Sequence, residues 1–341
     1  TYHAWDGISR EELTTNRTYN PNGEIKRDGE VIGFYKDQTD NYRQTHYQLL
    51  WDQGFGTKWH WNLGLHYTDG FGYYQEYKNA RTLQEYKLEP FYIGETKVKK
   101  SSLVRKKNVD SGFGGAVFSL TYKEDDLSST LGGGINKYAN DHYGNVIWVE
   151  NYLNALDADH EYYRNKGEKL DFNLYWKASV KAFSKMVAYA DLQYRHIGYK
   201  INGENDKWDW TASPEHMQVL NVDEKFDFFN PKVGLHYDFN HHNVAYASYS
   251  VAHKEPTRNN YTDGLMSEHP KAETLQDWEL GYTFRNERFT AGVNFYYMKY
   301  DDQLVLNGKL NEIGELMAEN VPDSYRMGVE LQAGVKITDW L

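Results

Sequence analysis

Residues 324–337 alternate between apolar and polar side chains along their whole length. Successive side chains of a β-strand point to opposite faces, so this alternation predicts a strand with one apolar and one polar face. The run is longer than the roughly 3–10 residues of most strands in soluble proteins. Its apolar face would consist of Tyr325, Met327, Val329, Leu331, Ala333, Val335 and Ile337. We therefore expect a long, two-faced strand here.

The same alternation recurs along much of the chain. It is clear at 59–67, 170–180, 274–284 and 288–300. Weaker versions lie near 43–53, 112–122, 127–138, 186–199, 229–239 and 243–254. Together these segments predict roughly eleven strands, and a tilted strand needs about 9–11 residues to cross a bilayer. We therefore expect an all-β, antiparallel transmembrane barrel, of which this chain supplies about half.

The predicted connections alternate between short and long. Short turns are expected at 54–57, 123–126, 183–185, 240–242 and 285–287, and long polar loops at 70–111, 139–167, 200–228, 255–273 and 301–323. This layout is typical of outer-membrane barrels, whereas a soluble sandwich has shorter strands and more uniform loops. The alternative is a large soluble all-β protein whose apolar faces form its core. Aromatic residues near predicted strand ends, such as Trp59 and Tyr67, favour the membrane.

Composition excludes several other classes. The chain has 341 residues and no cysteine, which rules out disulfides, thiolate metal sites and a cysteine nucleophile. No run of 18 apolar residues is present, which excludes an α-helical membrane protein. The formal charge of -11 argues against nucleic acid as a partner. No G-x-S-x-G, P-loop or H-E-x-x-H motif occurs, so we expect neither an enzyme nor a resident cofactor.

Three ordered stretches resemble TonB-dependent outer-membrane receptors of the iron-siderophore type. The first runs through 230–257 and ends in His253-Lys254-Glu255-Pro256-Thr257, where the family usually has Phe-Arg-Ala-Pro-Ser/Thr. The second, 269–282, contains the family's Glu-Leu-Gly as Glu279, Leu280 and Gly281. The third is similar to a hairpin with an Asn followed by Arg-x-Gly-x-Glu, and the matching residues in this chain are Asn320, Arg326, Gly328 and Glu330.

The resemblance implies a barrel of about 22 strands in the outer membrane of a Gram-negative bacterium. It implies import of a ferric siderophore or similar metal chelate, energised through TonB. The partners would then be TonB, the chelate, lipopolysaccharide and outer-membrane lipid. We expect residues 1–341 to be a partial barrel domain, with the N-terminal plug domain, its TonB-binding segment and the C-terminal strands outside this sequence.

Other functions of such a barrel stay open. The cargo could instead be cobalamin, haem or a glycan. A barrel that transports nothing and acts as an adhesin or scaffold is the alternative from a different class. The sequence shows no metal site either, because the acidic residues around 141–161 lack a regular ligand spacing and are typical of a solvated loop.

Two segments supply candidate ligand-binding residues. A basic segment would place Lys99, Lys100, Arg105 and Lys106 in one extracellular loop that attracts an anionic chelate. Contact with lipopolysaccharide phosphates and a solvated strand extension are the alternatives. The loop after Pro256 and Thr257 carries Arg258, Asn259 and Tyr261, which suit a chelate through stacking and charge-assisted hydrogen bonds. We expect Glu279, Arg326 and Glu330 to face the lumen and to hold the plug or pair across strands.

Overall fold

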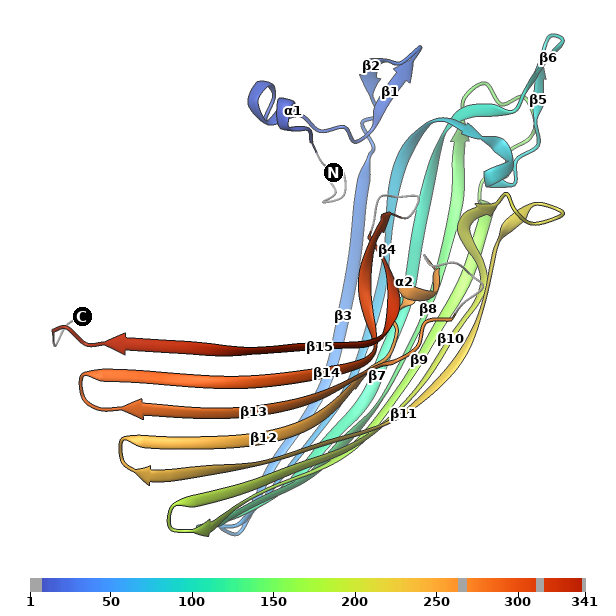
Figure 1. Ribbon diagram of the computed structural model, residues 1–341. Coiled ribbons are helices and arrows are strands. Elements are labelled where there is room, and N and C mark those ends of the chain that lie inside the picture. Colours follow the sequence, from blue (N-terminus) through green and yellow to red (C-terminus); the bar gives the residue numbers. More distant parts are fainter. Residues whose placement is uncertain (1–7, 263–268, 311–315, 339–341) are drawn as a thin grey trace.

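The computed structural model describes residues 8–262, 269–310 and 316–338 (Figure 1). Its main feature is a single antiparallel sheet of 11 strands, in the order β15-β14-β13-β12-β11-β10-β9-β8-β7-β4-β3. These strands are β3 (Thr39–Phe55), β4 (Trp59–Thr82), β7 (Lys100–Glu124), β8 (Leu127–Val149), β9 (His160–Phe183), β10 (Met186–Asp209), β11 (His216–Asn240), β12 (Asn243–Lys254), β13 (Glu273–Arg285), β14 (Phe289–Leu310) and β15 (Leu316–Val335). The all-β antiparallel prediction is confirmed.

Smaller elements lie away from the short turns (Figure 1). They are α1 (Arg10–Thr15), β1 (Glu24–Arg27), β2 (Glu30–Phe34), η1 (Leu83–Tyr86), β5 (Phe91–Ile93), β6 (Thr96–Val98) and α2 (Arg258–Thr262). An apolar core surrounds η1, where Leu83, Leu103 and Tyr162 are fully buried. This core joins η1 to the far ends of β7, β8 and β9. Within the described ranges, no helix is long and apolar enough to cross a membrane.

The five predicted short turns are confirmed, and all lie at the same end of the strands (Figure 1). The predicted long loops are largely wrong. β4 continues to Thr82, and much of 70–111, 139–167 and 200–228 is strand. The sequence pattern failed there because apolar–polar alternation requires one apolar environment. In these strand halves, neighbouring residues such as Leu103 and Val104 are both buried, so backbone pairing continues without that pattern.

The sheet curves into an open wall and does not close (Figure 1). In the described part of the chain, β3 and β15 form its two edges and do not pair with each other. An unpaired strand edge leaves backbone N–H and C=O groups without partners, which hydrocarbon does not tolerate. The structure is therefore part of a barrel.

The outer, convex face carries an exposed apolar band. Tyr249, Trp278, Tyr297 and Tyr325 form a row across four neighbouring strands, with ring centroids 5.0, 5.6 and 6.2 Å apart. Such a row matches the aromatic girdle of a membrane barrel. In the strands that carry the site described below, the band covers about 59–71, 127–138, 170–183 and 186–197. The strand halves beyond it project from the membrane.

The inner face contains a repeated pairing of glycine with tyrosine. Gly281 is opposite Tyr246, and Gly328 is opposite Tyr296. Each tyrosine ring covers its glycine, because a Cβ built on Gly281 would lie 2.0 Å from a ring carbon of Tyr246. Both glycines belong to the family-like motifs of the sequence. The glycines at 132 and 234 face Tyr175 and Tyr189 in the same way.

We predict that Gly281→Ala destabilises the barrel by about 1–3 kcal/mol, as expected for overpacking. The added methyl group would displace the Tyr246 ring and break its hydrogen bond to Asn294 (2.9 Å). Gly198→Ala is the matched control, because β10 pairs on both sides and a Cβ at Gly198 would lie 3.9 Å from its nearest neighbour. Thermal unfolding of the full-length protein in detergent measures both. Equal unfolding midpoints for the two variants would contradict the prediction.

Candidate ligand-binding site

The segment after β12 folds onto the inner face of the wall. Pro256 is buried, and α2 follows it directly. Tyr261 is 5 % exposed, and its ring packs at a tilt against that of Tyr199, with centroids 5.6 Å apart. It belongs to a small apolar cluster with Ile201 and neighbouring side chains. The structure thus places Tyr261 as an anchor for α2 rather than on a ligand-accessible surface.

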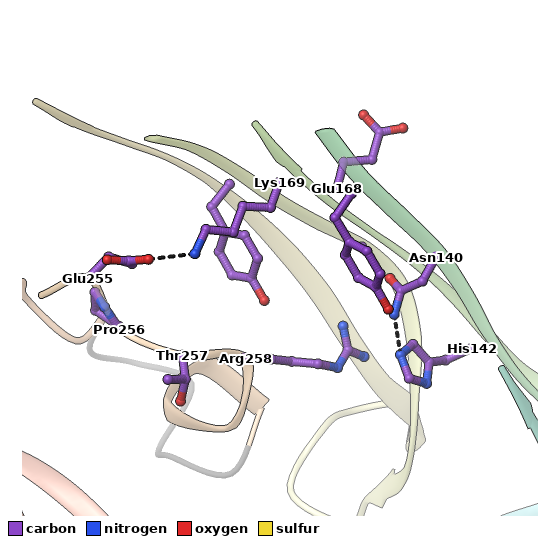
Figure 2. A pocket seen from close by; sticks show the side chains of 11 residues that line it. Asn140, His142, Glu168, Lys169, Glu255, Pro256, Thr257 and Arg258 are labelled. Atoms are coloured by element: carbon purple, nitrogen blue, oxygen red, sulfur yellow. Dashed lines mark hydrogen bonds and ion pairs between the residues drawn. The ribbon is translucent and has the colours of Figure 1, made fainter. Parts of the chain in front are cut away.

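A cavity of about 360 Å³ lies between this segment and strands β8, β9 and β10 (Figure 2). It is lined by Tyr138, Asn140, His142, Gly167, Glu168, Lys169, Tyr199, Glu255, Pro256, Thr257 and Arg258. Arg258 donates a hydrogen bond to the side-chain oxygen of Asn165 (2.6 Å). Gly167 makes room for these groups, because a Cβ there would lie 2.4 Å from Asn140 Oδ1 and 3.4 Å from the Arg258 guanidinium.

The polar groups in this cavity are only partly satisfied by the described residues. Asn140 Oδ1 is buried and has no hydrogen-bond partner among them. The Asn140 amide donates to His142 Nε2. Burial, together with the positive charges of Arg258 and Lys107, lowers the pKa of His142 to about 4. At neutral pH the cavity therefore offers an uncharged imidazole, an amide oxygen and one guanidinium.

The depressed pKa of His142 predicts a loss of stability in acid. Its ordinary pKa is 6.5. Between about pH 6.5 and 4 the unfolded chain binds a proton that the folded protein does not, so stability falls as the pH falls through this window. The free energy of unfolding is expected to fall by roughly 3 kcal/mol across the whole window. We expect the midpoint of thermal unfolding to fall further in the wild type than in His142→Gln between pH 7 and pH 4.5. An equal fall of the unfolding midpoint in the two proteins would contradict this prediction.

A second cavity, of about 320 Å³, adjoins the first and shares His142 and Arg258 with it. Amide and phenol groups dominate its lining, which includes Asn41, Tyr42, Tyr73, Tyr74, Asn108, Tyr163, Asn165 and Asn205. Such groups donate and accept hydrogen bonds without carrying charge, and the aromatic rings provide flat stacking surfaces. The two cavities together form one polar surface on the inner wall, centred on Arg258.

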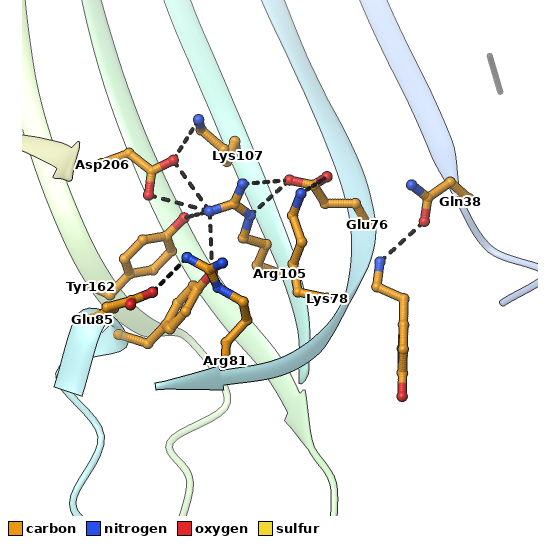
Figure 3. Close-up of polar contacts among 11 residues, drawn as sticks. Gln38, Glu76, Lys78, Arg81, Glu85, Arg105, Lys107, Tyr162 and Asp206 are labelled. Carbon is orange, nitrogen blue, oxygen red and sulfur yellow. Dashed lines mark hydrogen bonds and ion pairs between the residues drawn. The ribbon is translucent and has the colours of Figure 1, made fainter. Parts of the chain in front are cut away.

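A compact charge cluster lies next to the second cavity, on the part of the wall beyond the apolar band (Figure 3). Arg105 contacts Glu76 at 2.7 Å and Asp206 at 3.3 Å, and Lys107 contacts Asp206 at 2.5 Å. Burial alone would raise the pKa of Asp206, but Arg105 and Lys107 outweigh it and hold that pKa below its ordinary value. The cluster is therefore made of paired charges that tie β4, β7 and β10 together.

The predicted basic loop is corrected by the structure. Residues 100–107 lie in β7, so successive side chains point to opposite faces. Lys106 lies over the Tyr73 ring, 4.6 Å from its centroid, whereas Arg105 joins the charge cluster. Lys99 and Lys100 are exposed, as is Asn259. The basic residues therefore do not converge on one anion site, because β pairing separates them.

The family-like motif positions are spread over the inner and outer faces. Leu280 is 56 % exposed on the outer face, which places its neighbours Glu279 and Gly281 on the inner one.

The other motif residues contact neighbouring segments. Arg326 lies 5.2 Å from the centroid of the Tyr300 ring. Asn320 hydrogen bonds with the backbone of Lys271 and Asp302, which ties β15 to β14 and to the segment before β13. Glu330 pairs in register with Asn294. The Thr257 backbone and hydroxyl both donate to Asn260.

The sequence analysis missed most of the inner-wall residues of the site. Tyr138, Asn140 and His142 occupy alternate positions of β8, and Lys169 belongs to β9. The sequence Tyr-Ala-Asn-Asp-His at 138–142 shows no apolar–polar alternation, so its pattern predicts a loop from residue 139. In the described residues, no group of three or more His, Asp or Glu side chains could hold a metal ion.

Comparison with known proteins identifies the class of protein. The family model "TonB dependent receptor-like, beta-barrel" matches residues 1–341, and the chain belongs to this family. The family consists of outer-membrane β-barrel receptors for transport. A search of curated proteins found no match.

Solved structures of several receptors share the fold. The ferric citrate transporter FecA, in its unliganded form, matches with a TM-score of 0.59 and 11% identity over 96% of this chain and 42% of its own. The siderophore receptor PiuA from Acinetobacter baumannii matches with a TM-score of 0.56 and 12% identity over 89% of this chain and 46% of its own. The ferric-catecholate import receptor Fiu from E. coli, in its closed form, matches with a TM-score of 0.55 and 11% identity over 92% of this chain and 48% of its own. The chain thus spans about half the length of these receptors, and the likeness shows the fold.

Proposed function

We propose that this chain forms part of the barrel wall of a Gram-negative outer-membrane receptor that imports a ferric siderophore or a similar metal chelate. Import is energised through TonB, which binds a segment outside this sequence. Family membership and the likeness to siderophore-receptor folds support this proposal. The plug domain and the remaining barrel strands, also outside this sequence, complete the transporter.

The observation that carries the proposal is the polar surface around Arg258. Two cavities meet there, on the inner wall and beyond the apolar band. A cargo entering from outside would reach this level of the wall before it reached the membrane. Arg258 supplies the charge-assisted hydrogen bond, and the tyrosines supply stacking surfaces.

A second cargo class is favoured by one feature of this surface. Arg105 and Lys107 are ion-paired with Glu76 and Asp206, so their charged groups are already occupied by carboxylates of the wall. The asparagine-rich lining suits hydroxyl groups as well as chelate oxygens. A glycan or another polyhydroxylated nutrient is therefore the alternative cargo within the same import function.

Growth of a strain lacking the full-length receptor tests the proposal. We expect the strain to grow more slowly than its parent when a ferric siderophore or ferric citrate is the only iron source, and restored growth when the gene is returned. A defect on a glycan, haem or cobalamin alone would favour that cargo. No defect on any source, together with lost surface adhesion, would indicate an adhesin or scaffold.

A further inference from the structure

Glu255 lies at the point where the chain leaves β12 and turns onto the inner wall. Its carboxylate accepts hydrogen bonds from Lys169 Nζ (2.5 Å) and from both terminal nitrogens of Arg195 (3.1 and 3.2 Å), and Figure 2 shows the Lys169 contact. Asp171 holds Arg195 from the other side, with its carboxylate 3.1 Å from Nε. The Glu255 side chain is only 14% exposed.

This network joins three separate parts of the chain. Lys169 and Asp171 belong to β9, Arg195 belongs to β10, and Glu255 begins the segment that leads into α2. Two cations face two carboxylates, so the charges balance. Removing the Glu255 charge would leave Lys169 and Arg195 to share Asp171, with excess positive charge in a partly buried place. Loss of one partner from such a network costs more than the pair itself contributes.

The position of Glu255 governs the position of Arg258. Only Pro256 and Thr257 separate the two residues, and Pro256 restricts the backbone between them. Glu255 and Arg258 both line the first cavity, and Arg258 spans it to reach Asn165 on β9. Fixing the carboxylate on the β9–β10 wall therefore fixes where the guanidinium can lie. The sequence has glutamate at a box position where the family usually has alanine, so this attachment is a feature of this chain.

We propose that Glu255 is a positioning residue that attaches the segment 255–262 to Lys169 and Arg195 and thereby holds Arg258 over the cavity. The proposal concerns the ligand-free protein. Only its consequence for cargo affinity rests on the proposed function.

The test measures where α2 lies in the full-length receptor. Spin labels at Asn259→Cys on α2 and Ser184→Cys in the β9–β10 turn use two exposed positions, and this sequence contains no other cysteine. We expect the distance between the two labels to have one narrow distribution in the parent and a broad, shifted distribution in Glu255→Gln. Glu255→Asp, which keeps the carboxylate, should give a narrower distribution than Glu255→Gln. Asp191→Asn is the matched control, because Asp191 pairs with Lys177 on the same two strands without touching the segment.

An unchanged distribution in Glu255→Gln would overturn the proposal. So would equal broadening in Glu255→Gln and Asp191→Asn, since that indicates general loosening of the wall. A functional readout uses ferric citrate and a ferric catecholate as probes. Glu255→Gln should raise the Kd of a bound probe about tenfold. In an Arg258→Ala background it should change that Kd less than about twofold, because coupled residues are not additive. If neither probe binds the parent, the cargo proposal fails, while the distance measurement still decides the role of Glu255.

Discussion

Arg258→Ala is expected to weaken cargo binding by roughly 10- to 100-fold, the range for loss of a hydrogen bond to a charged group. Arg258 is the guanidinium shared by both cavities, and its removal takes the positive charge from their junction. Asn165 and His142 stay in place but are uncharged at neutral pH. Arg258→Lys should restore part of the affinity, because it returns the positive charge. The recovery should be incomplete, because an ammonium lacks the planar fork of the guanidinium.

The control for this prediction is Ser184→Ala, at an exposed position in the β9–β10 turn that lines neither cavity. Titration of the purified full-length receptor with the chelate that supports growth measures all three variants. Binding by Arg258→Ala that equals that of Ser184→Ala would show that the cargo contacts another part of the barrel.

Arg105→Met should destabilise the projecting end of the wall by about 1.5–3 kcal/mol, the range for loss of hydrogen bonds to charged groups, because Glu76 and Asp206 each keep a lysine partner. Arg105 is 13% exposed, and its guanidinium lies between Glu76 and Asp206. Lys107 would still pair with Asp206 and Lys78 with Glu76 (2.8 Å), but the guanidinium that joins the two carboxylates would be lost. Tyr86 and Tyr162, which accept hydrogen bonds from Arg105, join the cluster to the apolar core around η1.

Hydrogen exchange of the full-length protein measures this effect locally. Amides near 100–108 and 202–208 should exchange faster in Arg105→Met, whereas amides in the membrane-spanning parts of the same strands should not change. Lys99→Met is the control, because Lys99 is exposed. Equal exchange in Arg105→Met and Lys99→Met would contradict the proposed role of the cluster.

The sequence predicted the membrane-spanning half of the fold well, for a physical reason. Lipid on one side and lumen on the other impose a strict alternation, as in 324–337, and the short turns need few residues. The projecting halves could not be predicted in this way. Neighbouring strand residues such as Leu103 and Val104 are both buried there, so their order carries no period-two signal.

The candidate site was predictable only in part. Arg258 was accessible to sequence reasoning because it directly follows the Pro256-Thr257 motif. Its partners were not, since Asn140, His142 and Asn165 lie far away along the chain and meet it only through strand register and wall curvature. Tyr261 was expected to face the ligand, but the apolar surface of Tyr199 and Ile201 gives its ring a buried place instead.

The central claim is that the inner wall around Arg258 binds the imported cargo. The most direct test is the structure of the full-length receptor bound to the chelate that supports growth. We expect ligand density between α2 and the inner faces of β8, β9 and β10, within hydrogen-bonding distance of the Arg258 guanidinium. Ligand density held entirely by other strands or loops, with the two cavities empty, would contradict the claim.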